Sequence, residues 1–143
     1  MSYNINDAFL ASLAYRTDAL FQGNVLVSPN GALWSVELRS EDRGDGYQGA
    51  LFRNLVTGEY RFASRGSEPL REPIQDLFQA DLQMGLQLIP TQAVSQSLFF
   101  GDVRNHVRRN GGDPSAITLV GDSLGGSLVM FLGVANPSNP VHA

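Results

Sequence analysis

The sequence predicts an α/β fold whose sheet is partly parallel, on three observations. Two strand-like runs, 47–54 and 59–64, are joined by Thr57-Gly58, which indicates a β-hairpin. A short apolar and β-rich run at Ile117–Val120 is typical of a strand buried on both faces. Segments with helical periodicity flank that run, and an alternation of helix, strand and helix indicates parallel strands.

Length and composition predict a single globular domain spanning residues 1–143. Of the 143 residues, 43% are hydrophobic and 17% are charged, which is ordinary for a globular protein. The net charge of −4 argues against a nucleic-acid partner, because such proteins present a basic face. The chain has no cysteine, which excludes disulfides and thiolate metal ligands. We expect neither a metal nor an organic cofactor.

The N-terminal segment does not resemble a targeting signal. It has no basic stretch followed by a long apolar run, so we expect no signal peptide. No apolar run approaches the roughly 18 residues that a membrane span needs. A cytoplasmic location and an export route independent of a signal peptide both remain open.

Two elements are predicted before the hairpin. Apolar residues recur at helical spacing over 8–15, and Asn6 or Asp7 would cap that helix. After a Pro-Asn-Gly turn, apolar and polar residues alternate over Trp34–Leu38, which predicts a half-buried strand.

Three helices are predicted after the hairpin. Helical spacing covers 72–87, and this helix should stop before Pro90. A second helix is predicted over 93–109, where Gly101 lowers the helix propensity. The apolar segment 127–135 has the length and composition of a third helix.

A candidate nucleophile lies between the apolar strand and this last helix. The stretch VGDSLGGS places Ser123 midway between Gly121 and Gly125. A nucleophile elbow needs this arrangement, because its serine sits on a tight strand-to-helix turn where larger side chains two positions away would collide. The N–H of Leu124, directly after the serine, would then point at an oxyanion.

Two other interpretations fit the same letters. Gly125 and Gly126 would also serve a purely structural strand-to-helix turn; the spacing and lysine of a phosphate-binding loop are absent. The letters Gly-Asp-Ser-Leu also form the signature of GDSL esterases. That signature follows the first strand near the N-terminus, whereas here about 120 residues precede it. We therefore treat this match as coincidence.

The sequence resembles the class 3 lipases, a fungal-lipase-like family, over roughly residues 47–134. ITLVGDSLGGSL resembles that family's V-x-G-H-S-L-G-G-A elbow. EYRFASRGSEP resembles its strand ending in aromatic-Arg-Gly-Thr, and IQDLFQADLQMGL resembles its D-W-x-x-D-L stretch, with Asp76 and Asp81 at the acidic positions.

The resemblance implies an α/β-hydrolase-like three-layer sandwich with a mostly parallel sheet and an N-terminal β-hairpin. It implies a serine carboxylic-ester hydrolase acting on acylglycerols or phospholipids through an acyl-enzyme on Ser123. The oxyanion hole would use the backbone N–H groups of Ser67 and Leu124. This chain departs from the family pattern at Asp122, where histidine is commonest, and at Ser64, which takes the place directly before Arg65.

The acid and histidine of a triad are harder to find. α/β-Hydrolases place them after the serine, but no acid follows Ser123 and the only later histidine is His142. His106 precedes the elbow on a predicted helix and suits a surface position. We therefore expect an incomplete domain ending just after the nucleophile helix, with Ile117–Val120 as an exposed sheet edge prone to self-association.

Two functions follow as hypotheses. One is a lipase-type enzyme whose substrate is a lipid or another ester, contacted at the lipid interface and without a membrane span. The other is a non-catalytic or truncated hydrolase-like domain that lacks the acid and histidine of the triad.

Overall fold

A six-stranded mixed sheet forms the centre of the protein. The computed structural model describes residues 5–16, 19–41, 44–65, 82–122 and 124–143. Within them the strands pair in sequence order. They are β1 (Val25–Val27), β2 (Leu33–Arg39), β3 (Gln48–Asn54), β4 (Tyr60–Arg65), β5 (Thr118–Gly121) and β6 (Val141–His142). Strands β1 to β4 run antiparallel to their neighbours, whereas β4, β5 and β6 are parallel.

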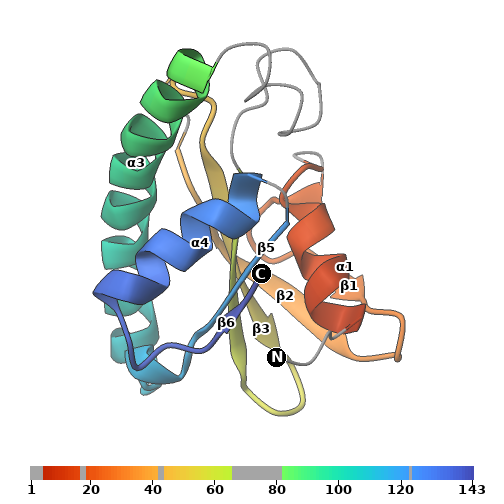
Figure 1. Cartoon of the computed structure of the whole chain (residues 1–143). Helices are drawn as coiled ribbons and strands as arrows, with labels where there is room; N and C mark the ends of the chain where they lie inside the picture. The colour runs from red at the N-terminus through yellow and green to blue at the C-terminus, as the bar shows by residue number, and fades with distance from the viewer. Residues whose placement is uncertain (1–4, 17–18, 42–43, 66–81, 123) are drawn as a thin grey trace.

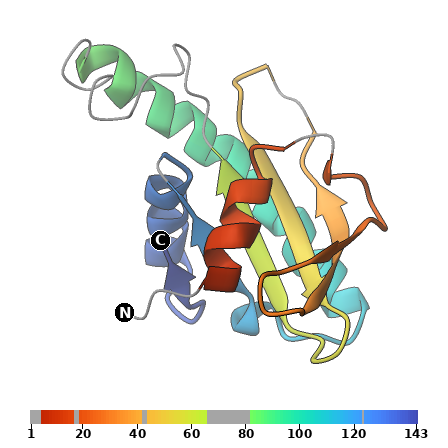
Figure 2. The same ribbon diagram turned by 90° about the vertical axis from the view of Figure 1, so that its right-hand side faces the viewer.

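Helices cover both faces of the sheet, which gives three layers (Figures 1 and 2). Helix α1 (Ile5–Leu13) lies on one face. Helices α3 (Leu82–Arg109) and α4 (Leu124–Ala135) lie on the other. A short 3₁₀ turn, Pro114–Ala116, leads into β5. The structure therefore has an α/β architecture.

Each face of the sheet has its own hydrophobic core. Phe62 of β4 is fully buried on the α3 and α4 side, where it packs against the rings of Phe99 and Phe100. The next residue, Ala63, belongs to the core beneath α1, together with Val120 of β5. This alternation is the period of two expected of a strand. It also places Ser64 on the same face as Phe62.

Several sequence predictions are confirmed. The hairpin is present as β3 and β4, and the alternating segment lies within β2. The apolar run forms β5, with Ile117 directly before it. The last helix begins earlier than predicted, at Leu124.

Other predictions are wrong. The sheet is mixed and not mostly parallel, because three of its five pairings are antiparallel. Helix α3 continues through Pro90. A proline removes one backbone hydrogen bond of the helix. The later turns bury Val103 and Val107 against the sheet, and this packing offsets the lost hydrogen bond. Residues 72–81 lie outside the described residues.

The expected caps and edges also differ. Helix α1 starts at Ile5, so Asn6 and Asp7 lie inside its first turn and do not cap it. Strand β5 is not an exposed edge, because β6 pairs with it through Val141 and His142. The outward face of α4 is exposed.

Candidate functional site

The strand-to-helix turn predicted around the candidate nucleophile has described residues on both sides. Strand β5 ends at Gly121 and helix α4 begins at Leu124, only three residues later. Ser123 itself lies outside the described residues. The described residues Gly121 and Leu124 fix where the strand ends and where the helix begins.

The glycines of the motif allow this turn to pack backbone against backbone. A Cβ added to Gly121 would lie 2.4 Å from the carbonyl oxygen of Gly125. A Cβ added to Gly125 would lie 2.0 Å from the carbonyl oxygen of Ser64 in β4. Carbon atoms do not approach oxygen so closely, so both positions require glycine. The first turn of α4 is therefore held directly against β5 and β4.

The end of β4 lies beside the same turn. Ser64 pairs with Gly121 in the parallel register of β4 and β5. The carboxyl ends of these two parallel strands therefore meet, and the chain that leaves β4 after Arg65 starts next to the β5–α4 connection. Ser67, Asp76 and Asp81 follow Arg65 and lie outside the described residues.

An aromatic residue and a cation approach the turn from the α1 side. The Tyr15 hydroxyl donates a hydrogen bond to the backbone carbonyl of Asp122 at 3.1 Å. The guanidinium of Arg65 lies over the Tyr15 ring, 5.2 Å from its centroid. Sequence patterns do not indicate this contact, because Arg65 and Asp122 are 50 and 107 residues from Tyr15. The Asp122 residue is exposed.

A buried chain of polar groups lies under the turn on the opposite side of the sheet. Tyr47 Oη and Ser64 Oγ are 2.7 Å apart. Ser64 Oγ donates to Gln96 Oε1 at 2.7 Å. The Gln96 side-chain amide then donates to the carbonyl of Leu128 in α4 at 2.8 Å. We call this set the buried relay: Tyr47, Ser64, Gln96 and the Leu128 carbonyl.

The buried relay explains why a serine is tolerated directly before Arg65. Ser64 is fully buried, and a lone hydroxyl there would cost free energy without a partner. Burial raises the pKa of the Tyr47 hydroxyl well above its usual value of 10.0. Tyr47 therefore keeps its proton and donates to Ser64, whose own proton goes to Gln96.

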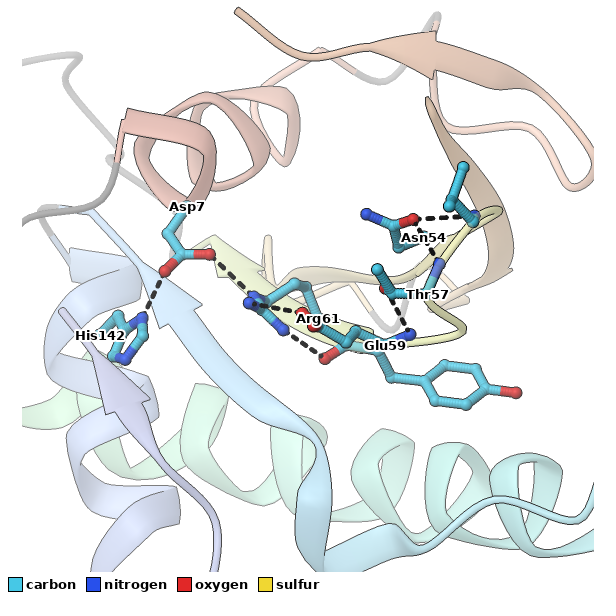
Figure 3. Close-up of polar contacts among 8 residues, drawn as sticks. Asp7, Asn54, Thr57, Glu59, Arg61 and His142 are labelled. Carbon is cyan, nitrogen blue, oxygen red and sulfur yellow. Dashed lines mark hydrogen bonds and ion pairs between the residues drawn. The ribbon is translucent and has the colours of Figure 1, made fainter. Parts of the chain in front are cut away.

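The two histidines lie in different surroundings. His106 is partly exposed on α3, outside the β4–β5 end. His142 lies on β6, where its Nδ1 contacts Oδ2 of Asp7 (Figure 3). The other carboxylate oxygen of Asp7 accepts a hydrogen bond from Nε of Arg61 at 2.8 Å. Asp7 is thus a buried bridge between α1, β4 and β6, a role that its place in a helix turn did not indicate.

Comparisons with known proteins show a likeness to a solved structure. The sequence matches no protein-family model and no curated protein. Its fold is similar to the crystal structure of the MDLA N225Q mutant from Penicillium cyclopium, with a TM-score of 0.57 and 16% sequence identity. The similarity covers 97% of this chain and 57% of that chain, so this chain spans little more than half of that protein's length. At this identity the likeness concerns the fold alone.

Within the described residues, no helix is long and apolar enough to cross a membrane.

Proposed function

We propose that this chain is a serine carboxylic-ester hydrolase of lipase type with an α/β-hydrolase fold, or the nucleophile-bearing part of one. The observation that carries the proposal is the glycine-dependent turn between β5 and α4, packed against the end of β4. This is the setting in which a G-x-S-x-G serine acts as a nucleophile.

In the proposed reaction Ser123 Oγ attacks the carbonyl carbon of an ester, and its proton passes to a general base. The tetrahedral intermediate carries its negative charge on oxygen, which accepts hydrogen bonds from the N–H groups of Leu124 and Ser67. Collapse expels the alcohol, which takes up the proton, and leaves an acyl group on Ser123. Water then attacks this acyl-enzyme and releases the carboxylic acid.

Acylglycerols or phospholipids are the substrate class that the family resemblance suggests. The fold is compatible with that resemblance, and the short apolar β5 with its adjoining apolar α4 supports the elbow on which it rests. We therefore propose lipid esters as substrates, bound at a lipid surface.

A non-catalytic hydrolase-like domain is the second candidate function. One observation favours it: the only histidine after Ser123, His142, is engaged by Asp7, which also binds Arg61. Because the same carboxylate bridges α1, β4 and β6, a structural role alone accounts for the contact of Asp7 with His142. Without a base, a serine keeps only residual reactivity.

Labelling with a fluorophosphonate probe separates the two candidates. The wild-type protein should be labelled, and Ser123→Ala should not. Ser127→Ala changes a serine of helix α4 only four positions further along the chain, and this matched control should label like the wild type. A folded wild-type protein that resists the probe would exclude an active nucleophile.

Hydrolysis of p-nitrophenyl esters with short and long acyl chains tests turnover. Activity that disappears in Ser123→Ala supports the enzyme, and its persistence in His142→Gln would exclude His142 as the base. Labelling without any turnover would favour the truncated domain.

A further inference from the structure

The buried relay connects the two elements that border the candidate site. Ser64 belongs to β4, one residue before its end at Arg65. Leu128 lies in the second turn of α4, four residues after the helix begins. Gln96 of α3 is bonded to both, through one amide oxygen and one amide nitrogen.

The relay is closed to water. Ser64, Gln96 and Tyr47 are 0%, 1% and 4% exposed. Hydrogen bonds in such surroundings are stronger than in water, and losing one partner leaves the other unsatisfied. The lengths of 2.7–2.8 Å therefore fix the separation of β4, α3 and α4 within a narrow range.

Steric contact complements the relay at the same place. The carbonyl of Ser64 lies against the backbone of Gly125, which sets how closely β4 and α4 can approach. The side chain of Ser64 sets how far apart they can move, because Gln96 ties it to Leu128. Ser64 thus sets both the smallest and the largest separation of β4 and α4.

We propose that Gln96, acting through Ser64, is a positioning residue that holds the start of α4, and with it the Leu124 N–H, at a fixed spacing from the end of β4. This inference rests on the proposed function, in which the Leu124 N–H is an oxyanion donor. A displacement of such a donor by about 1 Å costs on the order of a hundredfold in rate.

Gln96→Met tests this role, because methionine has a similar length but offers no amide. In the active protein kcat for a p-nitrophenyl ester should fall at least about tenfold while KM changes less than about twofold. Ser64→Ala breaks the same link with almost no change of volume and should act in the same direction. If Gln96→Met fails to fold, Ser64→Ala takes its place as the test of the proposal.

Tyr47→Phe is the matched control. It removes one hydroxyl from the relay but leaves the path from Ser64 through Gln96 to Leu128 intact. We expect it to lower thermal stability while kcat stays within about threefold of the wild type. An equal loss of kcat in Tyr47→Phe and Gln96→Met would indicate general loosening of the core and overturn the proposal.

Hydrogen exchange of the Leu128 amide, which donates to the Leu124 carbonyl in the first turn of α4, provides a readout that does not need activity. Exchange in Gln96→Met should be at least about tenfold faster than in the wild type, with no such change in Tyr47→Phe. If the wild type shows no turnover, the proposed function fails, and this exchange alone decides the positioning role. In that case, unchanged exchange in Gln96→Met overturns the positioning role of Gln96. In an active protein, an unchanged kcat in Gln96→Met overturns it as well.

Discussion

Ser64 and Gly125 touch through their backbones: a Cβ on Gly125 would lie 2.0 Å from the Ser64 carbonyl oxygen. Gly125→Ala must therefore separate β4 from α4, although alanine is the better helix former. We expect a loss of about 2 kcal/mol or more in the free energy of unfolding, by chemical denaturation. Any active protein should lose most of its turnover as well.

Gly101→Ala is the control for that substitution. Gly101 also lies inside a helix, but nothing lies within 4 Å of an added Cβ. The same change should there raise stability by roughly 0.5–1 kcal/mol, because alanine is favoured over glycine in a helix. Similar effects at the two positions would contradict the close packing of the turn.

Asp7 should stabilise the fold more than an exposed acid does. Its carboxylate is 5% exposed and bridges Arg61 and His142. Asp7→Ala leaves the largely buried Arg61 guanidinium without this partner, and we expect unfolding to become easier by about 2–4 kcal/mol. Glu59→Ala removes the exposed partner of Arg61 and should cost less than about 1 kcal/mol. Equal losses would argue against the bridge.

The parts of the fold that the sequence predicted have strong local signals. The hairpin has a turn between two β-rich runs, and β5 and α4 are apolar segments separated by glycines. Strands β1 and β6 went undetected because they have three and two residues. Such strands are specified by the pairing partner and not by their own pattern.

The site was only partly predictable for a related reason. The role of Gly125 follows from its spacing to Ser123, which is local in sequence. The relay instead joins Ser64 to Gln96, 32 residues away, and Asp7 meets His142 across 135 residues. A buried glutamine on a helix is indistinguishable from an exposed one until its partners are known.

Tyr47 should make the fold sensitive to alkaline conditions. Its pKa is raised in the folded state above its usual 10.0, so the folded protein retains a proton that the unfolded chain loses. The stabilisation is complete below pH 10 and is lost as pH rises above it, by up to about 1.4 kcal/mol for each pH unit.

Denaturation of the wild type and Tyr47→Phe between pH 8 and about pH 11 measures this effect. The difference between the two stabilities should be constant below the usual pKa of tyrosine and shrink above it, since phenylalanine does not titrate. A difference independent of pH would show that Tyr47 ionises equally in both states.

The outward face of α4 leaves apolar side chains exposed, and we expect association there and not at the β5 edge, because β6 pairs with that edge. Met130, Phe131 and Val134 are 58%, 58% and 83% exposed, and they line a shallow depression together with Ser127. Grouped apolar side chains of this kind favour association, whereas single ones do not.

Val134→Ser and Val56→Ser make a matched pair, because both valines are 83% exposed but Val56 lies in the β3–β4 turn, away from this depression. Val134→Ser should lower both the binding of a hydrophobic dye and the concentration dependence of the sedimentation coefficient. Val56→Ser should change neither, since it breaks up no cluster. If the two substitutions have the same effect, exposure of single residues and not the α4 surface governs association. A different result would place association at the sheet edge: no effect of Val134→Ser, but loss of association in Val141→Asp. Val141 lies on β6, the outermost strand of the described sheet.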